Sequence, residues 1–363
     1  MRVVFDAFWY VDGPPSQRHV LREIVATWSD LFPADELILV VRRRTSSAAI
    51  ESAPDGVRVR SSRLYPHALL ATLSVGRVAR AEGATGVLSH NFAPRFRAGV
   101  SAIFLHDVLF VDHPEWFTRF ERVYFSFMPR LIKRADIVFT SSVTEGDRIA
   151  RVTRAPAITP VGIGLSEELI GVAPDDGVGR RLALAQHSFL LAVGRLNVRK
   201  NLGRTIAGLL GSGTISKQRP LVVVGSGDGK GEVLSAAAKA AVEEGTLIFA
   251  GHVTDAELRW LYENAAAAIF ASLGEGFGMP PVEAAYFGCP LVVSDLPVFR
   301  ETVGEWATFV DPTSPEDIAR GVVEVLARAR PHRDSVHWLE KYNWRDTVQA
   351  LRARMITESE ARR

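Results

Sequence analysis

The chain has 363 residues, of which 47% are hydrophobic and 23% charged, and its formal net charge is +2. This length suits two domains, since a single domain usually spans about 100–200 residues. The single cysteine, Cys289, excludes a disulfide framework and a metal site built from cysteines. The small net charge gives no sign of a nucleic-acid partner. We therefore expect an ordinary globular protein with two cores.

The sequence predicts neither a membrane-spanning helix nor a signal peptide, and its charge is unevenly distributed. No apolar run reaches the roughly 18–20 residues of a membrane-spanning helix, and the first residues do not resemble a signal peptide, so we expect a cytoplasmic protein. Residues 1–165 carry 21 Lys and Arg against 16 Asp and Glu, whereas residues 166–363 carry 22 against 25. This asymmetry fits an anionic partner for the first half, and it fits random scatter of charge equally well.

Short apolar runs recur along both halves of the chain and alternate with longer amphipathic segments. Each run is bounded by Gly, Pro or Ser and is too short for a buried helix, so we interpret it as a strand. Their nearly continuous Val, Ile and Leu content is typical of parallel strands buried on both faces. We therefore expect an α/β protein with two doubly wound, Rossmann-like domains. The predicted strands are 1–9, 36–43, 56–62, 85–90, 100–107, 135–142, 189–195, 220–227, 246–252, 267–273, 290–295 and 307–311.

A stretch rich in Gly, Pro and Asp separates the two sets of strands. We take residues 1–165 as the first domain, 166–187 as a linker and 188–335 as the second domain. Residues 336–363 form a terminal segment, which we predict to be a helix interrupted at Asn343.

The segment GEGFGMPPVE at 274–283 is the strongest candidate for a binding loop. It follows the predicted strand at 267–273, turns on glycines and enters a helix marked by two prolines. Gly276 and Gly278 let backbone amides approach phosphate or sugar oxygens, and the carboxylates of Glu275 and Glu283 suit sugar hydroxyls. The spacing alone is equally compatible with an ordinary glycine-rich turn that leads into a helix.

A second candidate is GRLNVRKNLGR at 194–204, directly after the predicted strand 189–195. In a parallel sheet, ligands bind at the carboxyl ends of the strands. Arg195 and Lys200 straddle this loop and could neutralise a pyrophosphate, with a forked guanidinium and a point charge respectively. An isolated basic loop of this kind is more often simply solvated. The neighbouring glycine-rich loop favours the anion site here.

Both candidate loops belong to a longer run of motifs that resembles a known family. GRLNVRKNL, followed by GHVTDAELRWLYENAAAAIFASLGEGFGMPPVEAAYFGCPLVVSDLPVFRETVG, is similar to the C-terminal domain of retaining GT-B glycosyltransferases of the family-four group, which use nucleotide sugars. Their E-x7-E signature corresponds to Glu275 and Glu283. FLHDVLFVDHPEWF and RADIVFTSSVTEGD also resemble this family, the first of them its mannosyltransferase-like members. The resemblance implies two domains facing across a cleft, with 1–165 on the acceptor side and 188–335 binding the nucleotide sugar. It also implies that the terminal helix crosses back to the first domain.

The resemblance also implies roles for individual residues. Arg195 and Lys200 would hold the donor diphosphate, and Glu283 would bind the ribose. Glu275 would hold hydroxyls of the transferred sugar and position it without acting as a covalent nucleophile. The remaining donor contacts would be the backbone of Gly276, Phe277 and Gly278, the turn Gly251, His252 and Val253 beside the base, and Leu258. The family needs no metal ion, and we expect neither a metal nor a cofactor.

Two histidines of the first domain are further candidate site residues. His106, in the pair His106-Asp107, would face the donor sugar from the first domain if the resemblance holds. On its own, a single histidine at a strand end is more often a structural residue. His90 is a weaker candidate on the acceptor side, and there we favour a structural role.

The first loop, VDGPPSQRHV, departs from the family pattern. Members usually carry a glycine pair here, whereas this chain keeps Gly13 and follows it with Pro14 and Pro15, which remove amide donors. Donor contact from this loop is therefore in doubt, and Gln17 and Arg18 could take part on the acceptor side instead.

The segment 113–134, HPEWFTRFERVYFSFMPRLIKR, interleaves aromatic and basic side chains. Such a helix can lie on a membrane surface. It can equally pack in the core of the first domain, which we favour because aromatic residues all around a helix are usually buried.

Taken together, the sequence predicts a retaining, metal-independent glycosyltransferase of polysaccharide biosynthesis. Its partners would be a nucleotide-sugar donor, with GDP-mannose first and dTDP-rhamnose second, and a glycan or lipid-linked acceptor. A sugar-nucleotide epimerase of the same fold is an alternative, and a sugar-binding protein is a more distant one. A nicotinamide dehydrogenase is disfavoured because VVVGSGDGKG at 222–231 gives no clean GxGxxG fingerprint.

Overall fold

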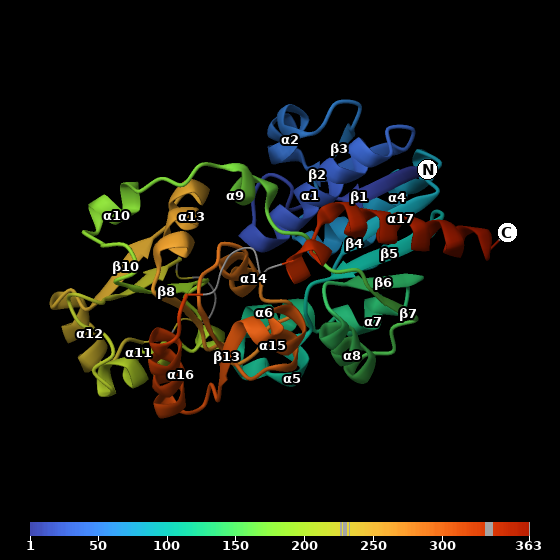
Figure 1. Cartoon of the computed structure of the whole chain (residues 1–363). Coiled ribbons are helices and arrows are strands. Elements are labelled where there is room, and N and C mark those ends of the chain that lie inside the picture. Colours follow the sequence, from blue (N-terminus) through green and yellow to red (C-terminus); the bar gives the residue numbers. More distant parts are fainter. Residues whose placement is uncertain (226, 228–230, 232, 331–336, 363) are drawn as a thin grey trace. The chain divides into compact units, whose positions relative to one another are not determined.

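The computed structural model describes residues 1–225, 227, 231, 233–330 and 337–362. These residues fold into two compact units, each built on its own sheet (Figure 1). Unit 1 comprises Met1–Asp112, Arg119–Gly164 and Lys341–Arg363, and unit 2 comprises His113–Thr118 and Leu165–Glu340.

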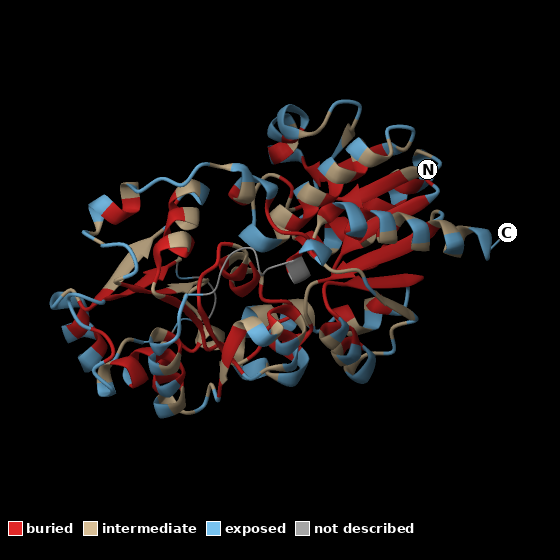
Figure 2. Ribbon diagram, viewed as in Figure 1, coloured by how far each residue is buried: buried red, intermediate tan, exposed pale blue. Residues whose placement is uncertain are grey.

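Unit 1 contains a parallel seven-stranded sheet in the order β3-β2-β1-β4-β5-β6-β7. Its central strands are buried along their whole length, and exposed residues gather on the surrounding helices (Figure 2). The strands are β1 Arg2–Asp6, β2 Glu36–Arg42, β3 Arg58–Ser62, β4 Gly86–His90, β5 Val100–Leu105, β6 Ile137–Thr140 and β7 Ala157–Pro160. The helices are α1 Pro15–Leu31, α2 Ser46–Ser52, α3 His67–Leu69, α4 Gly76–Ala81, α5 Leu109–Asp112, α6 Arg119–Phe125, α7 Met128–Ile132, α8 Val143–Val152 and α17 Trp344–Glu360.

Unit 2 repeats this plan with a parallel six-stranded sheet in the order β10-β9-β8-β11-β12-β13. The strands are β8 Leu190–Val193, β9 Leu221–Val224, β10 Leu247–Gly251, β11 Ala267–Phe270, β12 Leu291–Ser294 and β13 Ala307–Val310. The helices are α9 Glu167–Gly171, α10 Gly177–Arg181, α11 Leu202–Gly211, α12 Ala236–Glu243, α13 Asp255–Asn264, α14 Met279–Tyr286, α15 Pro297–Thr302 and α16 Pro315–Ala327. One face of this sheet forms a core with α11 and α16, in which Ile206, Leu209, Ile318 and Val322 are buried.

The two parallel sheets confirm the predicted fold class, and every predicted strand is present. The sequence pattern misses only β7 among the described residues. This four-residue edge strand, AITP, is not fully buried at any position, so it lacks the apolar run that marks the others.

The segments at the two domain boundaries each belong to one of the compact units. The stretch 166–187, predicted to be a linker, contains α9 and α10 and belongs to unit 2. Arg259 on α13 donates to the carbonyls of Ile170 and Val172 at 2.8 and 2.7 Å, which fixes the end of α9. Beyond Lys341 the chain belongs to unit 1, where α17 packs against α1 and Arg352 pairs with Asp35 at 2.7 Å.

The aromatic segment 113–134 differs from the expectation that it forms core. Helix α6 has no buried residue, and Phe120, Val123 and Phe127 are 76, 65 and 55% exposed. The following helix α7 does contain buried residues, Met128 and Ile132. The prediction of a buried helix is therefore wrong for α6. Aromatic side chains on all sides of a helix do not ensure that the helix is buried when it has only seven residues and packs on one side.

Candidate functional site

Two loops leave neighbouring strands of unit 2 at the point where the strand order reverses. Strands β9 and β10 lie on one side of β8, and β12 and β13 lie on the far side of β11. In open parallel sheets ligands bind at such a switch point, outside the carboxyl ends of the strands. The loop after β8 leads through Lys200 into α11, and the loop after β11 carries Glu275 into α14. These are the two segments that the sequence analysis singled out.

Hydrogen bonds fasten the two loops to each other. The amide of Leu273 donates to the Arg199 carbonyl at 2.8 Å. Asn201 is fully buried in a left-handed conformation with φ of 58°, and its Nδ2 donates to the carbonyls of Ala271 at 2.9 Å and Pro312 at 2.7 Å. Asparagine tolerates this backbone conformation better than most residues do. These hydrogen bonds thus fix the positions of the two loops relative to each other without a ligand.

The central contact of the site is an ion pair between these loops. Lys200 Nζ lies 2.6 Å from Glu275 Oε1, and an Arg199 guanidinium nitrogen lies 3.9 Å from Oε2. Glu275 is only 6% exposed. Burial alone would raise the pKa of its carboxyl, but the charges of Lys200 and Arg199 and the hydrogen bonds from Lys200 and Ser272 outweigh it and lower the pKa to about 2. Glu275 is therefore an ionised, fixed hydrogen-bond acceptor at neutral pH.

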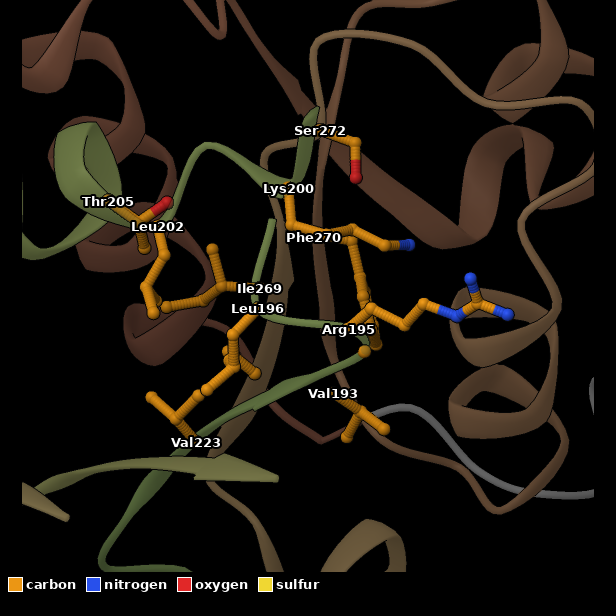
Figure 3. A pocket seen from close by; sticks show the side chains of 12 residues that line it. Val193, Arg195, Leu196, Lys200, Leu202, Thr205, Val223, Ile269, Phe270 and Ser272 are labelled. Carbon is orange, nitrogen blue, oxygen red and sulfur yellow. The ribbon is translucent and has the colours of Figure 1, made fainter. Parts of the chain in front are cut away.

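A pocket opens beside this pair at the carboxyl end of β8. Its walls come from β8, β9, β11 and the start of α11, and its polar rim includes Arg195, Lys200 and Ser272. In Figure 3 the Arg195 guanidinium and the Lys200 ammonium extend toward the same side, away from the apolar floor formed by Val223 and Ile269. Two cations on one rim suit a ligand with a compact negative charge, such as a phosphate.

Glu283 is the fifth residue of α14 and lies in its second turn. Its Oε2 accepts a hydrogen bond from the hydroxyl of Tyr262 on α13 at 3.0 Å. Burial and the nearby Asp255 charge outweigh that hydrogen bond and raise the pKa of Glu283 to about 7. The two predicted carboxylates therefore differ in kind, because Glu275 has cations beside it and Glu283 has a phenol.

The glycines between the two carboxylates have a steric function that can be read from the backbone. Residues 274–278 are all buried, and Gly278 has φ of 85° at the N-terminus of α14. A Cβ atom at Gly278 would lie 2.5 Å from Cε1 of Phe299. A side chain is therefore excluded here both by the backbone angle and by close packing. The loop that carries Gly276 and Phe277 can enter its helix only through a glycine.

The remaining predicted donor residues lie on the neighbouring strand β10 and on α13. Gly251 ends β10 with φ of 69°, and its carbonyl accepts a hydrogen bond from the amide of Gly225 at 2.9 Å. His252 and Val253 follow, and Leu258 lies in the first half of α13. They thus occupy the carboxyl edge of the sheet that also carries Lys200, and their contact with a base stays a prediction.

Both histidines singled out in the first half lie at strand ends of unit 1. His90 is the last residue of β4, and His106 follows β5 directly. Their rings stack in parallel with centroids 5.6 Å apart. Burial lowers the pKa of His106 to about 4, with Asp107 opposing, and burial together with His106 lowers that of His90 to about 3. Both rings are therefore neutral at pH 7, and the donor contact of His106 stays a prediction.

The three residues predicted on the acceptor side lie in the loop after β1 and at the start of α1. Gly13 has φ of 131°, and a Cβ atom there would lie 2.2 Å from Cε3 of Trp9. Gln17 and Arg18 lie in the first turn of α1, which begins at Pro15. The prolines thus start a helix at once after the single glycine, and an acceptor contact from this loop is still a prediction.

Three residues that contact the candidate site escape sequence reasoning. Asn201, Tyr262 and Arg199 each complete the site through a contact that only the folded chain creates. Arg199 and Asn201 could have been found because they lie inside the basic loop. Tyr262 offered no signal, since it reads as one more apolar position of a helix.

Comparisons with known proteins agree with this geometry. The family described as Glycosyl transferases group 1 matches residues 182–338, which include both loops. The chain carries a group 1 glycosyltransferase domain. It is 30% identical over 274 residues to the serotype-specific mannosyltransferase WbdA of Escherichia coli, a match that covers 70% of this chain and 33% of that protein. It is also 28% identical over 228 residues to the O-antigen chain mannosyltransferase RfbU of Salmonella typhimurium, covering 62% of this chain and 60% of the relative.

The chain therefore spans about a third of WbdA and corresponds to less than two thirds of RfbU. Solved structures extend the likeness over nearly the whole chain. Sucrose-phosphate synthase from Thermosynechococcus elongatus superposes with a TM-score of 0.67 at 17% identity, covering 99% of this chain and 98% of that one. WaaG, a glycosyltransferase involved in lipopolysaccharide biosynthesis, gives 0.66 at 14% identity, covering 96% and 94%. These likenesses confirm the expected GT-B fold.

Proposed function

We propose that this protein is a glycosyltransferase that moves a hexose or deoxyhexose from a nucleotide diphosphate sugar to a glycan or lipid-linked acceptor in polysaccharide biosynthesis. The observation that carries the proposal is the pair of half-buried Lys200 and buried Glu275 at the switch point of a group 1 domain. GDP-mannose is the first choice of donor, because the relatives in the comparisons include O-antigen mannosyltransferases. A dTDP-rhamnose donor is the second.

In this proposal the cations of unit 2 stabilise the leaving group. Arg195 and Lys200 neutralise the diphosphate, whose negative charge grows as the bond from its oxygen to the anomeric carbon breaks. Glu275, fixed as an anion, accepts hydrogen bonds from the transferred sugar, and Glu283 does the same for the ribose. The acceptor oxygen bonds to the anomeric carbon from the face that the diphosphate leaves, and the hydroxyl proton passes to the departing phosphate. Configuration is then retained without a covalent intermediate.

We also propose that the reaction requires no metal ion, because Arg195 and Lys200 supply the positive charge at the diphosphate position. Turnover that is unchanged by an excess of EDTA supports this part of the proposal. Loss of turnover that magnesium or manganese restores would overturn it.

The function is tested first by nucleotide binding. A ligand that binds the folded state raises the melting temperature by mass action, so GDP, dTDP and UDP are compared in a thermal-shift assay. Lys200→Met should abolish the shift given by the best nucleotide. Lys217→Met, which changes an exposed lysine of the same unit, is the matched control and should retain it. Equal shifts in both variants would refute the diphosphate role of Lys200.

The reaction itself is tested with GDP-mannose in the presence and absence of a mannose-terminated oligosaccharide. Transfer predicts a lengthened oligosaccharide whose new linkage is α, as seen by NMR. Full turnover of the nucleotide sugar without any acceptor would favour the epimerase alternative. A β linkage would refute retention.

We propose further that α6 contacts a membrane surface. Phe120 and Val123 of α6 and Phe127, two residues after its end, are exposed, as are Arg119 and Arg122 of the same helix, a combination that suits an anionic lipid surface. None of the helices in the described part of the chain is long and apolar enough to span a bilayer, so the contact would be peripheral.

Flotation with vesicles tests this contact. Wild-type protein should float with vesicles containing phosphatidylglycerol, and the double variant Phe120→Ser, Phe127→Ser should not. Val323→Ser, which removes an exposed valine of unit 2, is the control and should float normally. Flotation of the double variant at the wild-type level would refute the role of α6.

A further inference from the structure

The sheet of unit 1 has its own switch point, and polar side chains gather there. Its strand order reverses between β1 and β4, since β2 and β3 lie beyond β1 and β5, β6 and β7 lie beyond β4. Asp6 ends β1, His90 ends β4 and His106 follows the next strand, β5. The same rule that places a ligand beside Lys200 and Glu275 in unit 2 therefore places one here.

At this switch point a buried carboxylate holds a histidine, and the histidine holds a tyrosine. Asp6 and His67 are each 1% exposed, and His67 Nε2 lies 2.7 Å from Asp6 Oδ2. On the other side of the ring, Nδ1 lies 2.9 Å from the hydroxyl of Tyr124 on α6. The amides of Phe8 and His90 also donate to Asp6, at 3.3 and 3.4 Å. The three side chains come from β1, α3 and α6 and form one continuous hydrogen-bonded relay.

The relay determines what Tyr124 can offer to a ligand. Burial raises the pKa of Asp6, but the charge and hydrogen bond of His67 outweigh burial and lower it, so Asp6 is an acceptor. Nε2 of His67 must then carry the proton that Asp6 accepts. Nδ1 of the ring is the partner of the Tyr124 hydroxyl, as acceptor or as donor. In either case this contact uses one hydrogen bond of the hydroxyl and leaves another, as acceptor or as donor, for a ligand hydroxyl.

His90 adds a second group suited to a hydroxyl. It is 2% exposed, and within the described residues neither of its ring nitrogens has a hydrogen-bond partner; Nε2 of His106 is in the same position. Buried polar atoms are nearly always paired, so these nitrogens call for a partner. A neutral imidazole offers one donor and one acceptor, which matches a sugar hydroxyl. It gives no charge to hold a phosphate.

Aromatic rings complete the surroundings. Phe8, Trp9 and Phe92 pack around His67 with ring centroids 5.0, 5.5 and 5.6 Å away, and Phe92 also meets Tyr124 edge-on at 5.3 Å. Aromatic faces next to hydroxyl-binding groups suit a pyranose, which has an apolar C–H face and a polar edge.

From these contacts we propose that Tyr124 and His90 bind hydroxyl groups of the acceptor sugar, and that Asp6 and His67 are positioning residues for Tyr124. The identification of the ligand as an acceptor rests on the proposed function. The binding of a neutral sugar at this edge of unit 1 can be measured without turnover.

The binding test uses saturation-transfer NMR with the methyl glycosides of mannose, glucose, galactose and rhamnose in the presence of GDP. At least one glycoside should receive magnetisation from the wild-type protein. Tyr124→Phe and His90→Gln should each weaken that binding about 5- to 10-fold, the effect of losing one hydrogen bond. Tyr10→Phe is the matched control, because its hydroxyl donates to the Ser52 carbonyl of the same unit at 3.2 Å, and it should bind normally.

A second measurement separates positioning from general structural damage. Removing the sugar hydroxyl that Tyr124 binds should weaken binding to wild-type protein but not weaken binding to Tyr124→Phe any further, so one deoxy glycoside should be non-additive with the variant. His67→Asn should reproduce the Tyr124→Phe pattern, while both retain the GDP thermal shift of the wild type. The inference is overturned if no glycoside binds, or if every deoxy analogue is additive with Tyr124→Phe. Absence of transfer by a protein that still binds a glycoside in this pattern would count against the proposed function alone.

Discussion

The Lys200–Glu275 pair makes a quantitative prediction about unit 2. Replacing Lys200 by Met removes the cation 2.6 Å from a carboxylate that is 6% exposed, and leaves the more distant cation of Arg199, at 3.9 Å, and the hydrogen bond from Ser272. A carboxyl whose pKa falls from 4.5 to about 2 on folding gains about 3 kcal/mol of stability in its ionised form. Losing most of that interaction should lower the free energy of unfolding by about 3 kcal/mol at pH 7.

The sign of the pH dependence follows from the same shift. Because folding lowers this pKa, the stabilisation is fully present above about pH 4.5 and is lost as the pH falls toward 2. Wild-type protein should therefore lose stability through this window more steeply than Lys200→Met does. Glu275→Gln should show the same flattened pH dependence.

A double-mutant cycle provides the measurement. The variants are Lys200→Met, Glu275→Gln and their combination, with Lys217→Met as the exposed control. Native-state hydrogen exchange of peptides from β8 and α11 reports the free energy of unfolding for unit 2 alone. The coupling energy should be about 3 kcal/mol, so the double variant should be far more stable than the sum of the single losses implies.

Additivity of the two substitutions within about 0.5 kcal/mol would refute this reasoning. So would a Lys200→Met variant whose loss of stability matches that of Lys217→Met. Either result would mean that solvent already screens the pair, as it does at exposed sites.

Three other predictions concern the same unit. Since burial holds the pKa of Glu283 at about 7, GDP binding through its ionised form should weaken by up to about tenfold per pH unit below 7, and calorimetry should find no such dependence in Glu283→Gln. The raised pKa also means that Glu283 increasingly destabilises the folded state as the pH rises from 4.5 through 7. Asn201→Ala leaves the buried carbonyl of Ala271 and the half-buried carbonyl of Pro312 without their donor and should cost about 3 kcal/mol in urea unfolding. A loss below about 1 kcal/mol would contradict the role of Asn201 in holding the two loops together. Gly278→Ala should lower the melting temperature more than Gly213→Ala does. Both glycines have positive φ, but only a side chain at position 278 would meet Phe299. Equal losses would show that the backbone angle alone matters.

The sequence predicted the part of the candidate site that each loop carries within itself. Arg195, Lys200, Glu275 and Gly278 all follow short apolar runs, and a parallel sheet brings the carboxyl ends of its strands to one edge. The strand period, the glycines and the prolines were enough to place these residues at that edge. The same pattern missed β7, whose residues are not fully buried.

What each loop meets was outside the reach of the sequence. Lys200 and Glu275 are separated by 75 positions in the chain, and only the order of β8 and β11 in the sheet makes them neighbours. The separation between the pKa values of Glu275 and Glu283 likewise depends on what surrounds each carboxylate after folding, namely cations in one case and a phenol in the other. Local pattern contains no information on either environment.

The division is sharpest in unit 1. Composition and the alternation of short apolar runs with amphipathic segments determined the two doubly wound sheets, the strand-end positions of His90 and His106, and the aromatic character of 113–134. Tertiary structure alone decided that His67 bridges Asp6 and Tyr124, and that Phe120 is exposed. The reason is physical: strand period and turn chemistry are properties of neighbouring residues, whereas burial and pairing depend on segments that meet only after the sheet has assembled.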